Sequence, residues 1–228
     1  MGLKFTALPW KENEKTKYRI RMRNEEGEME EIGKMEFELS GIKSEDKIKF
    51  INIRSTTQLF TMDFIEELKL KINADTFRPI IYESSLSTPQ GDINVKGEYS
   101  RRNVKIFSLS PQGKANHKIP ISGEIYDNSE IIHIFRALDF ENLSKTDFRI
   151  FNVLTAQQIS ASVELIGEEE IEVPAGKFEC YRIKLELCDL PQEMKQYFLY
   201  NRCEPKLFVK SIAGEQVVEL VNYNFKNA

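Results

Sequence analysis

Hydrophobic and polar residues alternate along most of this chain, so that every second side chain is apolar. Near the N-terminus, Tyr18, Ile20 and Met22 alternate with arginines. The same alternation recurs at residues 35–39, 48–53, 159–165, 178–187 and 207–223. A period of two is typical of β-strands that place one face against a core and the other in water. The pattern therefore predicts an all-β protein.

Turn-forming residues separate these segments. Pro-Gln-Gly-Asp at residues 89–92, Pro-Gln-Gly at 111–113 and Pro-Ala-Gly at 174–176 suit the tight connections of β-hairpins. Within one segment the alternation shifts by one residue at Phe50 and Ile51, which predicts a bulge or bend. Strands joined by hairpins form an antiparallel meander. Because one face is apolar, we expect a long curved antiparallel sheet, in the form of a half-barrel or flattened barrel.

Few segments suit helices. Residues 63–72 fit helical spacing, but Leu68, Leu70 and Ile72 also alternate with lysines, so we expect a strand there. Residues 139–146 suit a short helical turn or loop. With so few helices, the sequence predicts an apolar sheet face that lacks helices to cover it.

Nothing between the strands resembles a flexible linker, so the sequence predicts one β domain over residues 1–228. Within it, we expect residues 1–16 to form a poorly ordered N-terminal segment. Residues 1–14 contain no apolar run typical of a signal peptide. Two locations stay open: the cell envelope, after removal of an export signal, and the cytoplasm.

Composition narrows the class of partner. The chain is 41% hydrophobic and 30% charged, with 11 Gly and 8 Pro, which is typical of a globular protein. A net charge of −4 argues against nucleic acid as a partner, because a phosphate-binding face needs clustered Lys and Arg. No stretch approaches the ~18 apolar residues of a transmembrane helix. Oligomeric state leaves no trace in the sequence.

Candidate chemistry is sparse. The sequence has no P-loop, GxGxxG, GxSxG or HExxH motif. His117 and His133 lack the Cys, His or Asp spacing of a zinc site, so structural roles are favoured. The glutamates of residues 168–172 are best interpreted as a solvated strand end. We therefore expect no catalytic residue, metal or cofactor, and no ligand-binding residue can be singled out.

The cysteines allow two arrangements. Cys180 and Cys188 lie too far apart on one strand to form a disulfide. A symmetric hairpin about residues 190–193 that sets Cys188 opposite Lys195 also sets Cys180 opposite Cys203, within reach of a bridge. The alternatives are a disulfide between Cys180 and Cys203, which implies an oxidising compartment, and three free thiols.

Three segments carry a family resemblance: IYDN at residues 125–128, FRALDF at 135–140 and VPAGKFECY at 173–181. Together they resemble the bacterial family known as domain of unknown function 3108, which groups exported and lipoprotein-like proteins. The resemblance covers residues 17–223. It implies a curved antiparallel sheet similar to the half-barrels of periplasmic lipoprotein carriers, and no established activity.

The motif residues have structural interpretations. Asp127 and Asn128 belong to the first segment. Pro174 fixes φ at the first central turn position, and Gly176 can adopt a positive φ where the next strand starts. Phe178 is then expected to fill the apolar face.

Arg136 lies in an apolar context, where a buried guanidinium needs a carboxylate or carbonyl partner. Candidate partners are Asp127, Asp139 and the glutamates of residues 168–172. We expect a salt bridge that fixes strands together, in preference to a ligand-binding role.

Three functions remain. The first is a non-enzymatic protein of the cell envelope that binds an apolar or amphipathic ligand, a lipid or a lipoprotein segment, on the concave face of the curved sheet, in a groove lined by Phe, Tyr, Leu and Ile. The second is a structural or protein-interaction module with a self-filled core, recognised by exposed apolar residues or unpaired edge strands. The third is an enzyme of unknown type, for which the sequence displays no pocket of converging polar groups.

Overall fold

The computed structural model describes residues 2–6, 13–188 and 194–225. In these residues, 16 strands form a single sheet. The first strands are β1 (Glu14–Arg23), β2 (Met29–Leu39), β3 (Lys43–Glu45), β4 (Ile48–Leu59), β5 (Phe64–Asn73), β6 (Pro79–Thr88), β7 (Gly91–Tyr99), β8 (Asn103–Ser110) and β9 (Gly113–Pro120). The others are β10 (Tyr126–Asp127), β11 (Thr146–Asn152), β12 (Gln157–Val173), β13 (Gly176–Leu187), β14 (Met194–Asn201), β15 (Phe208–Ala213) and β16 (Gln216–Asn224).

The sheet is an almost continuous meander. Its order is β10-β11-β12-β13-β14-β15-β16-β1-β2-β4-β5-β6-β7-β8-β9, and β3 pairs only with β4. The pairs are antiparallel except for the parallel pair of β10 with β11. β1 joins the two halves because it pairs with β2 on one side and with the C-terminal strand β16 on the other. The ends of the order, β10 and β9, do not pair with each other, so the sheet stays open and the predicted all-β meander is confirmed.

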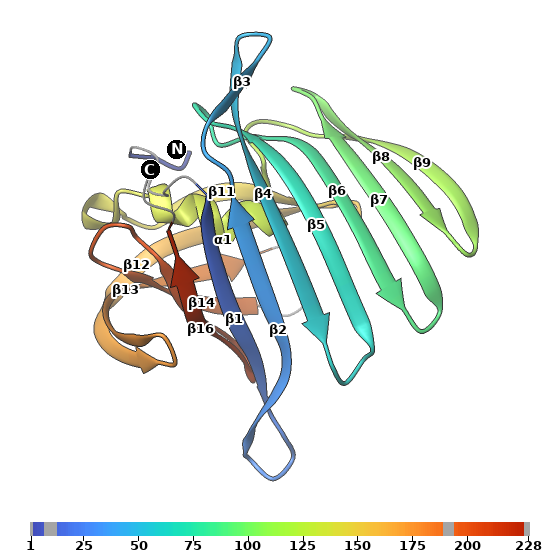
Figure 1. Ribbon diagram of the computed structural model, residues 1–228. Helices are drawn as coiled ribbons and strands as arrows, with labels where there is room; N and C mark the ends of the chain where they lie inside the picture. The colour runs from blue at the N-terminus through green and yellow to red at the C-terminus, as the bar shows by residue number, and fades with distance from the viewer. Residues whose placement is uncertain (1, 7–12, 189–193, 226–228) are drawn as a thin grey trace.

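The long hairpin of β12 and β13 curls back toward the C-terminal strand (Figure 1). Its register shifts between Leu165 and Gly167, where Gly167 has a φ of 153°, a value that favours glycine. At the tip of the hairpin, the Ala175 amide donates to the Leu220 carbonyl of β16 at 3.2 Å. This contact gives the C-terminal half a barrel-like curvature without closing the sheet.

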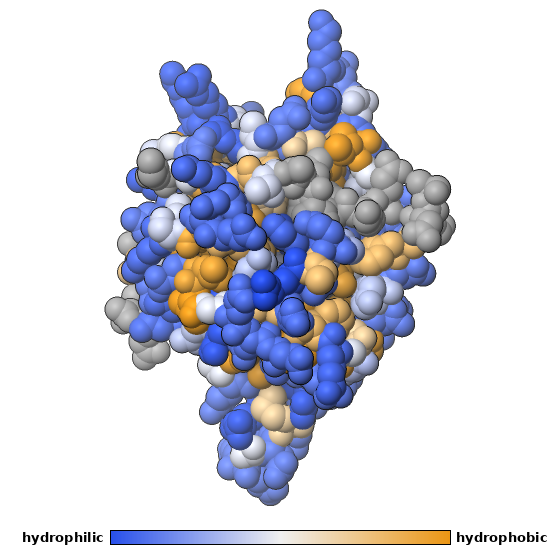
Figure 2. Space-filling view, turned by 90° about the vertical axis from the view of Figure 1, so that its left-hand side faces the viewer, coloured by the Kyte–Doolittle hydropathy of each residue, from blue (hydrophilic) through white to orange (hydrophobic). Residues whose placement is uncertain are grey.

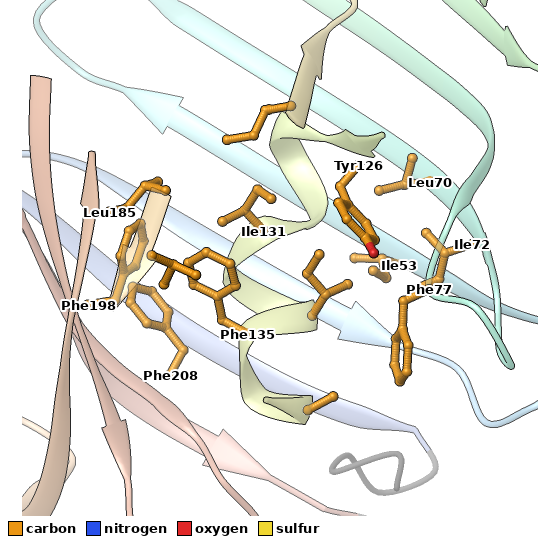
Figure 3. Close-up of a cluster of buried hydrophobic side chains, with 14 of the residues drawn as sticks. Ile53, Leu70, Ile72, Phe77, Tyr126, Ile131, Phe135, Leu185, Phe198 and Phe208 are labelled. Carbon is orange, nitrogen blue, oxygen red and sulfur yellow. The ribbon is translucent and has the colours of Figure 1, made fainter. Parts of the chain in front are cut away.

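A helical segment lies on the inner face of the curved sheet. It consists of η1 (Asn128–Glu130), α1 (Ile131–Ile134) and η2 (Phe135–Ala137), which we call the inner segment, and η3 (Phe140–Asn142) follows it. Figure 3 shows Ile131 and Phe135 of the inner segment between Leu185, Phe198 and Phe208 on one side and Tyr126, Leu70 and Ile53 on the other. Ile131, Ile134 and Phe135 are at most 2% exposed. The expectation of an apolar face without helices to cover it is therefore wrong.

Two local predictions have different outcomes. Residues 63–72 are extended, as predicted, because they form β5. At Phe50 and Ile51 the strand β4 has no register shift against β5, so the expected bulge is absent there. Both side chains are buried at the point where β4 changes partner. Up to Phe50 it pairs with β3, and from Ile53 onward it pairs with β2.

Residues 2–6 and 13–16 are the described parts of the segment predicted to be poorly ordered, and residues 14–16 begin β1. Leu3 is 8% exposed and belongs to the core, and Phe5 bridges to Leu138. Glu14 and Thr16 are buried on β1. The buried Glu14 has a charged partner that is described below.

β2 and β4 approach each other closely at Gly33 of β2. A Cβ atom at this position would lie within 2.3 Å of the Gln58 carbonyl oxygen, which belongs to rigid backbone. We expect Gly33→Ala to lower the free energy of unfolding by about 1–3 kcal/mol, since the strands have to separate. Urea unfolding measures this, with the neighbouring exposed change Lys34→Ala as the control. Equal stabilities of the two variants would contradict the close approach.

Candidate functional site

A buried ion pair fixes the inner segment to β1. Arg136 donates to the two carboxylate oxygens of Glu14 at 2.5 and 3.0 Å, and the side chains are 2% and 0% exposed. The Arg136 Nε also donates to the Lys206 carbonyl. Arg136 therefore has a structural salt bridge, as predicted, but Asp127, Asp139 and residues 168–172 were the wrong partners.

Asp127 and Asn128 lie at the start of the inner segment. Asp127 is the N-cap, and its Oδ1 accepts from the Ser129 amide at 2.8 Å. The Asp127 amide donates to Glu130 Oε1 at 2.8 Å, which completes the capping box of η1. The hydroxyl of Tyr99 on β7 donates to Asp127 Oδ2 and ties this end of the segment to the sheet.

Burial perturbs the titratable groups of the inner segment. It raises the pKa of Asp127 to about 6 and the pKa of Glu130 well above its usual range, and the Asp127 charge adds to the second shift. Burial also lowers the pKa of His133 to about 3, with a further contribution from Arg136. His133 packs edge-on against Phe37 with ring centroids 4.6 Å apart. The histidine is thus held neutral in a core position.

These contacts show that the inner face is occupied by the protein's own side chains. Hydrophobic residues of the inner segment pack in one core with the strands around them. Within the described residues, no three His, Cys, Asp or Glu side chains gather to hold a metal ion. The concave face expected to hold a ligand is thus filled by the protein itself, and the hollow described next lies on the outer face, the one turned away from the inner segment.

The outer face of β5–β9 contains a hollow of about 530 Å³. Two cross-strand rows of outward-facing side chains form its floor. The first, which we call the Lys69 row, runs Lys69, Glu83, Lys96, Phe107 and Asn116 from β5 to β9. The second, which we call the Glu67 row, runs Glu67, Ser85, Asn94, Leu109 and Lys114. We call this site the outer hollow.

One end of the outer hollow is apolar. Phe107 and Leu109 are 40% and 46% exposed and lie two residues apart on the same face of β8. Val104 and Ile106 of the same strand are buried on the inner face. β8 is therefore apolar on both faces, which is unusual for a strand with water on one side.

Charged groups surround these apolar side chains. Lys96 pairs with Glu98 at 2.9 Å, which raises the pKa of the lysine and lowers that of the glutamate. Lys114 stands directly opposite Leu109. A volume of several hundred Å³ lined by apolar side chains, three lysines and two glutamates suits a small amphipathic molecule.

Two further hollows, of about 300 and 210 Å³, continue along the outer face toward β1. Arg54 of β4 lines both of them, and Lys69 lines these two and the outer hollow as well. Arg54 and Lys69 stand directly opposite each other on adjacent strands.

The motif at residues 173–181 lies away from these hollows and shapes the β12–β13 hairpin. Gly176 has a φ of 130°, so its predicted positive φ is confirmed. Pro174 and Ala175 form the turn, since Val173 pairs with Gly176. Phe178 packs against Tyr223 with ring centroids 6.3 Å apart and is only partly buried. These residues support the curl of the sheet.

The proposed disulfide is not formed, and Cys180, Cys188 and Cys203 are free. In the observed register Cys180 stands opposite Asn201, and Lys195 stands opposite Glu186. The prediction was two residues out of register, which moves Cys203 beyond the end of β14. The expected turn at residues 190–193 lies outside the described residues.

Sequence reasoning missed Glu14, Arg54, Lys69 and the outer hollow. Glu14 is 122 positions from Arg136, so only the fold brings them together. One signal for the hollow was present, since residues 104–109 (VKIFSL) carry apolar side chains of both phases. That pattern indicates a strand that is apolar on both faces.

Comparison with known proteins adds a family and a fold. A profile of the family described as protein of unknown function (DUF3108) matches residues 13–202. No curated protein matches the sequence. The crystal structure of a beta-barrel-like protein of domain of unknown function DUF1849 from Brucella abortus superposes with a TM-score of 0.65 at 8% identity, covering 98% of this chain and 100% of that one. This similarity shows a shared fold.

Two other crystal structures are less similar. One is a candidate exported protein with a YmcC-like fold from Bacteroides fragilis, with a TM-score of 0.41 and 10% identity. The other is a candidate lipoprotein from Parabacteroides distasonis, with a TM-score of 0.36 and 12% identity. Each comparison covers 98% of this chain and 100% of the other chain. None of the helices in the described part of this chain is long and apolar enough to cross a membrane.

The buried ion pair predicts a large effect of Glu14→Gln. The change leaves the Arg136 guanidinium buried without an opposite charge, which costs about 3–5 kcal/mol of stability. Urea unfolding measures the loss, and Glu14→Leu combined with Arg136→Met is expected to recover most of it. The control is Glu36→Gln, which breaks the exposed pair with Lys17 at a cost below about 1 kcal/mol. Equal losses in Glu14→Gln and Glu36→Gln would contradict the assignment.

The raised pKa of Asp127 predicts a pH-dependent stability. Between about pH 4 and pH 6 the unfolded chain has released the Asp127 proton while the folded protein retains it, so rising pH destabilises the fold. Asp127→Asn keeps the cap and removes this loss. The free energy of unfolding of this variant, relative to that of wild type, should increase by about 3 kcal/mol between pH 4 and pH 7.

His133 acts in the opposite direction, because its lowered pKa makes the fold more stable as pH rises from about 3 toward 6.5. His133 is present in both proteins, so its contribution cancels in the difference. The exposed change Asp147→Asn serves as the control. A difference between Asp127→Asn and wild type that is constant from pH 4 to pH 7 would show that Asp127 is not perturbed.

Proposed function

Because the chain belongs to the DUF3108 family of proteins of unknown function, we propose a function from its geometry: non-enzymatic binding of an amphipathic ligand in the outer hollow. The observation that carries the proposal is the combination of Phe107 and Leu109 with the lysines of the two rows, in a hollow of about 530 Å³. Ligand sites join apolar walls to a few polar groups in this way. The ligand is a lipid or another molecule with one apolar and one polar end.

The filled inner face supports the choice of the outer face. A ligand on the inner face would have to displace the inner segment, whose Arg136 and Asp127 are anchored at both ends by buried contacts. Removing such a segment would expose the side chains of a close-packed core, which is costly. Binding in the outer hollow needs no rearrangement of the fold.

The proposal includes a location in the cell envelope. Its support is the family motif at residues 173–181, which resembles exported and lipoprotein-like proteins. Fractionation of cells that express the native gene tests the location, and recovery of the protein from the cytoplasm alone would contradict it.

A second function, a protein-interaction module, is supported by a separate observation. The turn between β4 and β5 exposes Phe60 and Met62, at 48% and 62%. Exposed apolar side chains at a hairpin tip suit a protein contact. The surface shown in Figure 2, on the side of β12–β16, is mostly hydrophilic with separate apolar patches, so it offers no broad apolar interface of this kind.

Leu109→Ser tests the proposed function. Burial of a leucine side chain against a ligand contributes about 1.5–3 kcal/mol, so its loss should weaken binding about ten-fold or more. Titration of the delipidated protein with a fluorescent fatty acid, below its micellar concentration, measures the dissociation constant. The matched control is Leu154→Ser, because Leu154 is 47% exposed and does not line the hollow. We expect Leu154→Ser to bind as wild type does.

Two results would overturn the proposal. One is the absence of saturable binding by wild type at micromolar probe. The other is equal weakening by Leu109→Ser and Leu154→Ser, which would mean that the probe does not occupy the outer hollow.

A further inference from the structure

We propose that the ligand is an anionic single-chain lipid whose charged head group binds between Arg54 and Lys69. This inference rests on the proposed function and adds the chemical class of the ligand and the position of its head. The acyl chain then lies across β6 and β7 toward Phe107 and Leu109.

Two cations lie side by side on the outer face, which is an unfavourable arrangement. Arg54 of β4 and Lys69 of β5 are direct cross-strand neighbours on the outer face, and both are exposed. Opposed like charges destabilise a sheet. Among the described residues, neither has an ion-pair partner within 4.0 Å. An anion placed between them would relieve this repulsion.

Beyond Lys69 the Lys69 row continues to Arg54, Glu38 and Lys15 of β4, β2 and β1, and the rest of this longer row contrasts with the two cations. Lys15 pairs with Glu38 at 2.9 Å, and Glu83 stands opposite both Lys69 and Lys96. Arg54 stands opposite Glu38 on its other side. The row therefore alternates in sign except at the one place where Arg54 meets Lys69, and that place lies between the hollows.

The distance from the cations to the apolar side chains fits a single-chain lipid. Lys69 lines all three hollows, so it borders the outer hollow as well as the two hollows beside Arg54. Three strand spacings separate Lys69 from Phe107, about 14 Å. A ligand that reaches both needs a negative charge at one end and an apolar end some 14 Å away. Fatty acids and monoacyl phospholipids share this chemistry.

Carboxylates around the cations define the size of the head group. Glu38 and Glu83 flank the pair along the row, and Glu67 lies beside Lys69 in the next row. Three carboxylates beside two cations limit the site to one small anion and disfavour a polyanion. A single carboxylate or phosphate group fits this arrangement, whereas the surface of an anionic membrane does not.

The test compares a head group with and without charge. A monoacylglycerol and the lysophosphatidic acid of the same chain differ only in the phosphate, and each displaces the fluorescent fatty acid from the protein. In wild type we expect lysophosphatidic acid to bind at least ten-fold more tightly than the monoacylglycerol. In the double variant Arg54→Gln, Lys69→Gln this preference should disappear, while the monoacylglycerol binds as before.

A second like-charge pair supplies the control. Lys105 of β8 stands opposite Lys118 of β9 on the same face, and neither lines one of the three hollows. Lys105→Gln combined with Lys118→Gln removes the same charge, so it reports the effect of net charge alone. We expect this variant to keep the wild-type preference. Equal loss of preference in both double variants would overturn the proposed head-group site.

Oleate, lysophosphatidic acid and phosphatidylglycerol vesicles distinguish a carboxylate head group, a phosphate head group and a membrane surface. Tight binding of oleate and lysophosphatidic acid supports a shared anion site, and tight binding of one alone assigns the head as carboxylate or phosphate. Binding to phosphatidylglycerol vesicles without binding of either monomeric lipid would overturn the inference in favour of a membrane surface. Binding of the monoacylglycerol as tightly as lysophosphatidic acid to wild type would refute the anion site but leave the proposed function intact.

Discussion

The ion pair of Arg136 with Glu14 is the interaction on which the interior depends. A guanidinium that is 2% exposed is tolerated only because a carboxylate and a carbonyl accept its hydrogen bonds. The pair connects the inner segment to β1, which itself joins the two halves of the sheet. Tyr99 fixes the other end of the segment through Asp127. The apolar inner face of the curved sheet is thereby covered by the chain itself.

Because the interior is filled by the protein's own side chains, the proposed ligand site lies on the outer face. There the cross-strand rows consist mostly of charged or polar side chains, which remain in water at little cost. Two features depart from that rule: the apolar outward side of β8 and the opposed cations of β4 and β5. Both cost stability in the absence of a ligand, and both line hollows that share Lys69. A single amphipathic ligand accounts for the two departures together.

Period-two alternation was enough to predict the all-β class, the antiparallel meander and the strand at β5, because strand geometry depends on local pattern. That the inner segment covers the inner face could not be predicted, because its helical turns are too short to show the apolar periodicity of an amphipathic helix. Register also lay beyond the sequence: a two-residue error misplaced Cys203, because the hairpin turn leaves register free to slip. Arg54 and Lys69 became a site only through cross-strand pairing, which a single sequence does not display.

Photo-crosslinking tests most directly whether the outer face binds the ligand. A fatty acid with a diazirine at the end of its chain would be irradiated with the protein, and the labelled residues would be mapped by mass spectrometry. The account predicts labels on β8 and β9, around Phe107 and Leu109, that excess unlabelled fatty acid suppresses. Labels concentrated on Ile131, Phe135 or other residues of the inner segment would contradict it.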